Sequence, residues 1–210
     1  MDKRATRGNP LVKVRVFVEG GGPHRKTQTE CRKAFRHFFE KFLGENAFHP
    51  GVSACGSRNE AYGDFCRSLR NDPDTLAILL VDAEGPVAAD RNPCAHLRDR
   101  AGWTSPMPEP QVHLMVQCME SWFLADRTAL QGFYGQGFKP NALPGNPAVE
   151  AIPKQDVMEG LARATKDTTK GEYHKTRHGF AILESLEPAR VSERSPHANA
   201  FLDFLREQLS

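Results

Sequence analysis

Residues 12–22 read VKVRVFVEGGG, an alternating apolar run that ends in a glutamate followed by three glycines. A second run, LAILLVDAEG at residues 76–85, ends in the acids Asp82 and Glu84 beside another glycine. Both runs are short, rich in aliphatic residues and bounded by glycine, which is typical of β-strands rather than of buried helices. The two stretches therefore predict two strands that each end in carboxylates.

The segments around these two strands predict an α/β fold. Helical and strand patterns alternate along the chain, in the order helix 27–43, strand 52–55, helix 59–69, short helix 94–100 and strand 111–117. Two successive strand–helix units of roughly 30 residues each separate Glu19 from Asp82, as right-handed crossovers in a parallel sheet require. We expect a flavodoxin-like, mostly parallel sheet of about four strands flanked by helices, and its acids would meet where the strand order reverses.

The remainder of the chain predicts several helices and one long loop. A helix is predicted at 120–130, a stretch rich in glycine and proline follows at 132–153, and the last helical patterns cover 156–165, 178–186 and 196–209. Thr27 with Glu30 predicts a capping box for the first helix, and Asn59 is the predicted cap of the second. We divide the chain into an α/β core, residues 1–132, and a loop and helical extension, residues 133–210, packed on that core.

The composition is that of an ordinary globular protein, with 39% hydrophobic and 26% charged residues. A formal net charge of +2 does not by itself indicate a nucleic-acid-binding protein. The five cysteines are odd in number and form no C-x-x-C pair, which argues against a disulfide framework or a zinc ribbon, and we expect them to be buried. The aliphatic run 76–81 is too short to span a membrane and no signal peptide is recognised, so we expect a cytoplasmic protein without a membrane partner.

The acids at the strand ends predict a metal site. Three carboxylates at one edge of a sheet repel one another unless a cation joins them. Carboxylate oxygens are the ligands that Mg²⁺ and Mn²⁺ prefer. Glu19, Asp82 and Glu84 therefore predict a site for one or two Mg²⁺ or Mn²⁺ ions.

Four short stretches resemble the Toprim domain of topoisomerases, primases and the overcoming-lysogenization-defect (OLD) nucleases. They are VFVEGGG at 16–22, LVDAE at 80–84, CMESWFLAD at 118–126 and YHKT at 173–176. More closely, the chain is similar to a prokaryotic Toprim-like family of unknown function whose small members are often encoded beside ATPases in phage-defence loci. The resemblance implies a Toprim-like fold, a metal-dependent nuclease and a partner ATPase.

The resemblance also implies a role for individual residues. Glu19 falls on the Toprim glutamate and Asp82 on the first acid of its D-x-D motif, while Glu84 stands where that motif has a second aspartate. Glu120 corresponds to a further acid of OLD-type nucleases, which would bind a second metal or orient water. Lys175 resembles a nuclease lysine that steadies a phosphate or a leaving group.

Basic residues near these motifs are predicted to contact phosphate or nucleic acid. They are Arg25, Lys26, Lys170, His174 and Arg177. His174 and His178 stand four apart, a spacing that could place two metal ligands on one helix face. No H-E-x-x-H pattern surrounds them, so we expect a surface or phosphate contact for both.

Together these features predict a Mg²⁺- or Mn²⁺-dependent endonuclease, with DNA as the favoured substrate, acting in anti-phage defence with a partner ATPase. The alternative is a non-catalytic adaptor or binding module that kept the fold, which the glutamate at position 84 and the near-neutral charge motivate. A phospho-receiver ranks last, because it needs paired acids at the first strand and a lone aspartate at the third. Structural alternatives stay open for the acids: Glu19 as a helix-capping or turn carboxylate, Asp82 and Glu84 as an acidic surface turn, and Glu120 as an acid favoured at a helix start. A homo-oligomer also stays open.

Overall fold

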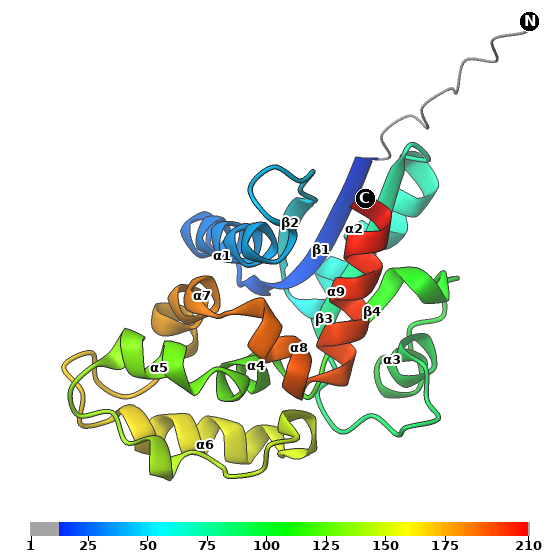
Figure 1. Cartoon of the computed structure of the whole chain (residues 1–210). Helices are drawn as coiled ribbons and strands as arrows, with labels where there is room; N and C mark the ends of the chain where they lie inside the picture. Colours follow the sequence, from blue (N-terminus) through cyan, green and yellow to red (C-terminus); the bar gives the residue numbers. More distant parts are fainter. Residues whose placement is uncertain (1–12, 210) are drawn as a thin grey trace, which may run out of the picture.

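The computed structural model describes residues 13–209 and confirms the predicted α/β fold. Its strands are β1 (Lys13–Gly21), β2 (Gly51–Gly56), β3 (Thr75–Asp82) and β4 (Val112–Met115). They pair in parallel in the order β2-β1-β3-β4, so the order reverses between β1 and β3 as in flavodoxin-like sheets (Figure 1). Val12, the predicted first residue of β1, lies outside the described residues.

Helices connect the strands and make up the carboxyl-terminal part of the chain. They are α1 (Arg25–Leu43), α2 (Arg58–Asn71), α3 (Pro93–Ala101), α4 (Met119–Ala125), α5 (Arg127–Tyr134), α6 (Lys154–Thr165), α7 (Lys175–Ser185), α8 (Pro188–Arg194) and α9 (Pro196–Leu209). Short 3₁₀ turns lie at Glu109–Gln111, Pro140–Ala142 and Val149–Ala151. None of the described helices is both long enough and apolar enough to cross a membrane.

The sheet buries both of its faces, and alternate residues of each strand serve opposite sides. On one face, Val16 of β1 and Ile78 of β3 join Phe35 of α1 and the helices of the carboxyl-terminal part in one apolar core. On the other, Phe17 and Leu79 join residues of α2 and α3 in a second core. A parallel sheet covered on both sides is expected to have such continuous apolar strands.

Three predicted details of the helices are wrong. Helix α1 begins at Arg25, and Thr27 lies inside it with its hydroxyl donating to the carbonyls of Gly21 and His24 rather than capping it. The cap of α2 is Ser57, not Asn59. The single helix predicted at 120–130 is two, because the Asp126 carboxylate accepts the Ala129 N–H and starts α5 afresh.

The capping box of α2 predicts a measurable loss for Ser57→Ala. The Ser57 hydroxyl accepts the Glu60 N–H at 3.3 Å, and a Glu60 carboxylate oxygen accepts the Ser57 N–H at 2.7 Å. Loss of the hydroxyl leaves one N–H of the first turn unpaired, so we expect the free energy of unfolding to fall by about 1 kcal/mol. Urea denaturation tests this expectation, and Ser57→Thr, which keeps a capping hydroxyl, serves as the control. Equal stability of the Ala and Thr variants would contradict it.

Helices of the carboxyl-terminal part gather beyond the carboxyl ends of the strands. Figure 1 shows α4, α5, α6 and α7 grouped at that end, away from the amino-terminal start of β1. Their apolar residues belong to the same core cluster as those of β1, β3 and α1. These helices bring further side chains to the edge of the sheet where the acids lie.

Candidate metal centre

The three acids predicted to bind metal lie together at the carboxyl ends of β1 and β3. The parallel register pairs Val18 with Leu80, which places the two strand ends side by side. One carboxylate oxygen from each of Glu19, Asp82 and Glu84 lies within 4.8 Å of the others. Glu19 is further held by the Asp82 N–H, which donates to its Oε2 at 3.3 Å.

Asp82 is the most enclosed of the three acids, with 2% of its surface exposed. Its Oδ1 accepts the N–H of Met119, at the start of α4, at 2.8 Å. Its Oδ2 faces two ammonium groups, Lys175 Nζ at 3.8 Å and Lys154 Nζ at 3.9 Å. The carboxylate is therefore fixed on one side by backbone and faces cations on the other.

Glu84 reaches the site from a left-handed backbone conformation, with φ of 62°. For a residue with a Cβ this conformation costs roughly 1–2 kcal/mol, so the surrounding contacts must impose it. Its N–H donates to the Gln117 carbonyl at 2.8 Å, and its carbonyl accepts from the Arg100 guanidinium. The turn after β3 thus holds the glutamate side chain next to Asp82.

Two lysines from the carboxyl-terminal part balance the acids. Lys154, the first residue of α6, contacts Glu84 Oε2 at 2.6 Å, and its backbone N–H donates to Gln117 Oε1 at 3.1 Å. Lys175, the first residue of α7, lies 3.6 Å from Glu120 Oε1 as well as near Asp82. Lys175 was predicted near the site, whereas Lys154 was missed. The helix-start signal at Pro153 marks where α6 begins, and no local pattern places its lysine beside an acid 70 residues earlier.

Glu120 contacts Lys175 and is not part of the cluster of three acids. Its side chain is fully buried, and its Oε1 accepts the Tyr173 hydroxyl at 2.9 Å. Its Oε2 has no hydrogen-bond partner within residues 13–209. Lys175 connects Glu120 to Asp82, so Glu120 is a counter-charge to the lysine in this arrangement.

The electrostatics of the site follow from burial and mutual repulsion. Burial, and then the neighbouring Glu19, raise the pKa of Asp82 to about 8. Burial likewise raises the pKa of Glu19. For Glu84 burial is outweighed by the Lys154 ammonium, which lowers its pKa, and for Lys175 burial is outweighed by Glu120, Asp82 and Glu19, which raise its pKa. A cation placed among the acids would remove this repulsion and favour their ionised forms.

A cavity of about 230 Å³ opens beside the acids. Glu19, Asp82, Lys175 and Phe180 line it together with glycine backbone from the ends of β1 and β2. Gly21 has φ of 86°, and a Cβ there would lie 2.6 Å from the Gln28 Cα. Glycine at this position therefore lets α1 pack directly against the end of β1 and keeps the cavity open.

The five predicted phosphate-contacting residues lie at the start of α1, in the segment before α7 and in the first turn of α7. Lys170 lies over the Phe133 ring, 5.1 Å from its centroid, and the His174 ring contacts the Thr176 hydroxyl at 3.1 Å. Arg25, Lys26 and Arg177 are exposed. Within residues 13–209 no hydrogen bond or ion pair joins any of the five to Glu19, Asp82 or Glu84. Their contact with phosphate stays a prediction.

The surface or phosphate contact predicted for His178 is wrong. The residue is 4% exposed and its Nδ1 lies 3.1 Å from the Tyr134 hydroxyl and 3.2 Å from the His174 backbone nitrogen. His178 therefore belongs to the packing between α5 and α7, whereas His174 lies at the surface just before α7.

Comparisons with known proteins add a family. A family model described as "Domain of unknown function (DUF4276)" matches residues 18–206, nearly the whole chain. No curated protein and no solved structure matches the chain.

Proposed function

The chain belongs to the DUF4276 family, a domain of unknown function, and from its site we propose that it is a metal-dependent phosphodiesterase acting on nucleic acid. One observation carries the proposal: oxygens of Glu19, Asp82 and Glu84 gather within 4.8 Å at the edge of the sheet where the strand order reverses. Three carboxylates form a hard, oxygen-only donor set, which fits Mg²⁺ or Mn²⁺ better than a softer metal.

The residues around the acids fit phosphodiester hydrolysis. Glu19, Asp82 and Glu84 would hold the metal, which in such sites activates water and stabilises charge on the leaving oxygen. Lys175 lines the same cavity, and its ammonium would bind a phosphate oxygen as a point charge. Lys154 contacts Glu84, and it would turn towards phosphate once a metal replaces it there.

Cleavage of supercoiled plasmid by the purified chain tests the proposal. We expect nicking that requires Mg²⁺ or Mn²⁺ and stops with a chelator, and we expect Glu19→Gln to lower the rate by about a hundredfold or more. Glu30→Gln, which removes an exposed acid of α1, is the matched control and is expected to nick like the wild type. Metal-dependent nicking that Glu19→Gln leaves unchanged would exclude these acids as the site.

A non-catalytic adaptor is the second candidate, and one contact favours it. Lys154 Nζ lies 2.6 Å from Glu84 Oε2, so a lysine already supplies positive charge among the acids. An adaptor predicts that neither Mg²⁺ nor Mn²⁺ raises the melting temperature, whereas a metal enzyme predicts a rise that grows with metal concentration.

We also propose a cellular compartment, a substrate and a partner for the protein. Its five cysteines are unpaired and buried, which suits a reducing compartment, and we place the protein in the cytoplasm. The resemblance to Toprim-like proteins supports DNA as the substrate and a partner ATPase in anti-phage defence. Two measurements would test that partnership: co-purification with an ATPase encoded beside this protein, and cleavage that rises when the ATPase is added.

A further inference from the structure

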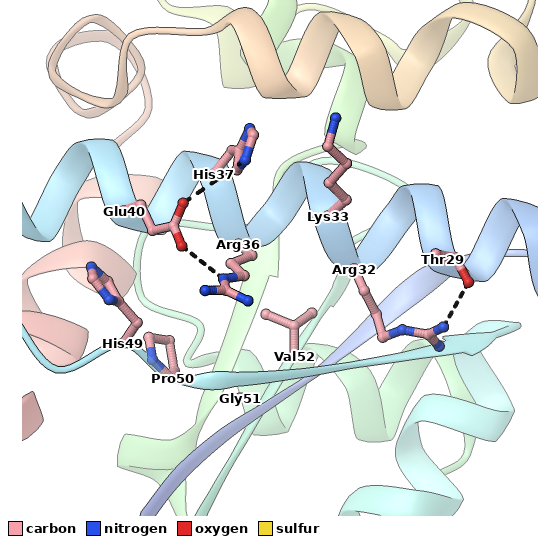
Figure 2. A pocket seen from close by; sticks show the side chains of 10 residues that line it. All are labelled: Thr29, Arg32, Lys33, Arg36, His37, Glu40, His49, Pro50, Gly51 and Val52. Atoms are coloured by element: carbon pink, nitrogen blue, oxygen red, sulfur yellow. Dashed lines mark hydrogen bonds and ion pairs between the residues drawn. The ribbon is translucent and has the colours of Figure 1, made fainter. Parts of the chain in front are cut away.

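An open groove of about 740 Å³ lies between α1 and β2, apart from the cavity at the acids. Strand β2 is the outermost strand of the described sheet, so this side of it has no neighbouring strand. In Figure 2, Arg32 and Arg36 point from α1 towards β2, while Lys33 and His37 point the other way, towards α7. The two arginines line the groove on its β2 side, and Lys33, His37 and Glu40 of α1 also line it.

The two arginines are available to an anionic ligand. Arg32 contacts the Thr29 hydroxyl at 2.8 Å, and no carboxylate pairs with it in the described part of the chain. Arg36 pairs with Glu40 at 2.7 Å, but its side chain is 69% exposed, and such surface pairs contribute little and exchange readily. One turn of helix, about 6 Å along the axis, separates the arginines, which is comparable to the spacing of neighbouring phosphates on an extended strand.

An exposed aromatic residue lies next to the groove along the chain. Phe48 is 57% exposed, and among residues 13–209 it is the one large apolar side chain in that state. It directly precedes His49, which lines the groove together with Arg36. An exposed ring beside a basic groove is the combination with which proteins bind single-stranded nucleic acid, because the ring stacks on a base and the cations follow the backbone.

The groove also begins next to the proposed active site. Thr29, its first residue on α1, follows Gln28, whose side-chain amide donates to the Gly22 carbonyl at 3.0 Å. Gly22 lines the cavity at the acids. A strand that follows α1 from the groove towards the first turn of the helix would approach this cavity.

We propose that the groove between α1 and β2 binds a single-stranded segment of nucleic acid, with phosphates on Arg32 and Arg36 and a base on Phe48. The inference rests on the proposed function for its link to cleavage, because the groove would lead the strand to the three acids. An acidic protein segment would also pair with the arginines and could pack on the ring, but it has no bases to stack on it. Direct comparison of oligonucleotides with an acidic polypeptide therefore distinguishes the two ligands.

Fluorescence anisotropy of labelled oligothymidylate and oligouridylate tests the proposal, using the full chain in EDTA so that neither metal nor cleavage contributes. We expect Arg32→Gln/Arg36→Gln to weaken binding about tenfold or more and to reduce the slope of log K against log salt by about 1.4. Phe48→Ala is expected to weaken binding roughly fivefold or more. Tighter binding of oligothymidylate would identify DNA as the ligand, and tighter binding of oligouridylate would identify RNA.

Arg70→Gln is the matched control, because this exposed arginine lies on α2, on the opposite face of the sheet. Binding equal to that of the wild type in the groove variants would overturn the proposal, as would an equal loss in Arg70→Gln. Binding of polyglutamate, but not of the oligonucleotides, would overturn it in favour of an acidic protein. Because the binding assay contains EDTA and needs no cleavage, groove-dependent binding supports this proposal even if the plasmid assay fails.

Discussion

We expect Asp82→Asn to abolish metal binding and cleavage while raising the melting temperature of the metal-free protein. Wild type should gain melting temperature when Mn²⁺ is added, and the variant should not. Cleavage should fall by more than about a hundredfold, since even the outer partners of metal ligands contribute 10–100-fold. Differential scanning fluorimetry with and without Mn²⁺, together with the plasmid assay, measures both effects.

The gain in stability follows from the position of Asp82. Its carboxylate is 2% exposed and close to Glu19 and Glu84, so the metal-free fold holds repelling acids in a buried place. Asparagine keeps an oxygen for the Met119 N–H and removes the charge. Lys175 and Lys154 retain Glu120 and Glu84 as partners in the variant. Sites that bind ligands commonly carry such a cost in stability.

The melting temperatures of the wild type and of Asp82→Asn should also depend differently on pH. Asp82 has a folded pKa of about 8 and an ordinary value of 3.8, so between these values the folded state binds the proton more tightly than the unfolded state. The stability of the metal-free wild type therefore falls as pH rises from about 4 to 8, and this contribution is absent from Asp82→Asn. We expect the variant's advantage in melting temperature to grow from pH 5 to pH 8. Mn²⁺ should reverse the trend in the wild type, because metal binding requires the ionised carboxylate.

Asp126→Asn is the matched control for this prediction. Asp126 is as buried as Asp82, but it caps α5 through the Ala129 N–H, accepts the Glu187 N–H and lies 3.5 Å from Arg190. Its replacement should lower the melting temperature and leave the shift with Mn²⁺ intact. If Asp82→Asn instead lowered the metal-free melting temperature at every pH, Asp82 would be a structural acid like Asp126.

The part of this site that could be predicted from sequence is the part built by local patterns. Alternation in 12–22 and the aliphatic run at 76–81 are properties of neighbouring residues, and each run ends in its acid. The parallel register pairs Val18 with Leu80, so the crossover rule then brings Glu19 and Asp82 together. The order β2-β1-β3-β4 is that of the predicted flavodoxin-like sheet, in which the strand order reverses between β1 and β3.

The part that could not be predicted depends on packing between distant segments. Lys154 meets Glu84 because the Val149–Ala151 turn and α6 fold back over the strand ends, where Gln117 accepts the Lys154 N–H. The sequence pattern of a capping box was also ambiguous. Thr27 with Glu30 and Ser57 with Glu60 both match it, but only Ser57 and Glu60 form a capping box in the structure. At Asp126 a capping carboxylate outweighed a continuous helical pattern.

The second large prediction concerns Glu120, because its Ala and Gln variants should differ sharply in the free energy of unfolding. Glu120→Ala removes a fully buried side chain and leaves the Tyr173 hydroxyl without its acceptor. A cavity and an unpaired polar group together predict a loss of about 2–4 kcal/mol in the free energy of unfolding. Equilibrium urea denaturation in the absence of metal measures it.

Glu120→Gln keeps an acceptor for Tyr173 and nearly the same volume, so we expect its stability to lie within about 1 kcal/mol of the wild type. Tyr173→Phe is the complementary control, since it removes the donor and leaves the Glu120 carboxylate with fewer partners. We expect Tyr173→Phe to lose about 1–2 kcal/mol alone and much less in the Glu120→Gln background. Additive losses in the double variant would mean that the two side chains do not interact.

Cleavage by the stable Glu120→Gln variant then separates two roles of the acid. As a counter-charge, Glu120 holds Lys175 beside Asp82, and its loss would lower cleavage about tenfold or more without changing the Mn²⁺-induced shift in melting temperature. If Glu120 were instead a second metal ligand, its loss would lower both the cleavage rate and the Mn²⁺-induced shift in melting temperature. Lys175 contacts both Glu120 and Asp82, and Glu120 is not part of the cluster of three acids, so we expect the first result. A parallel loss in Lys175→Gln, with no further loss when both substitutions are combined, would establish that Glu120 acts through the lysine.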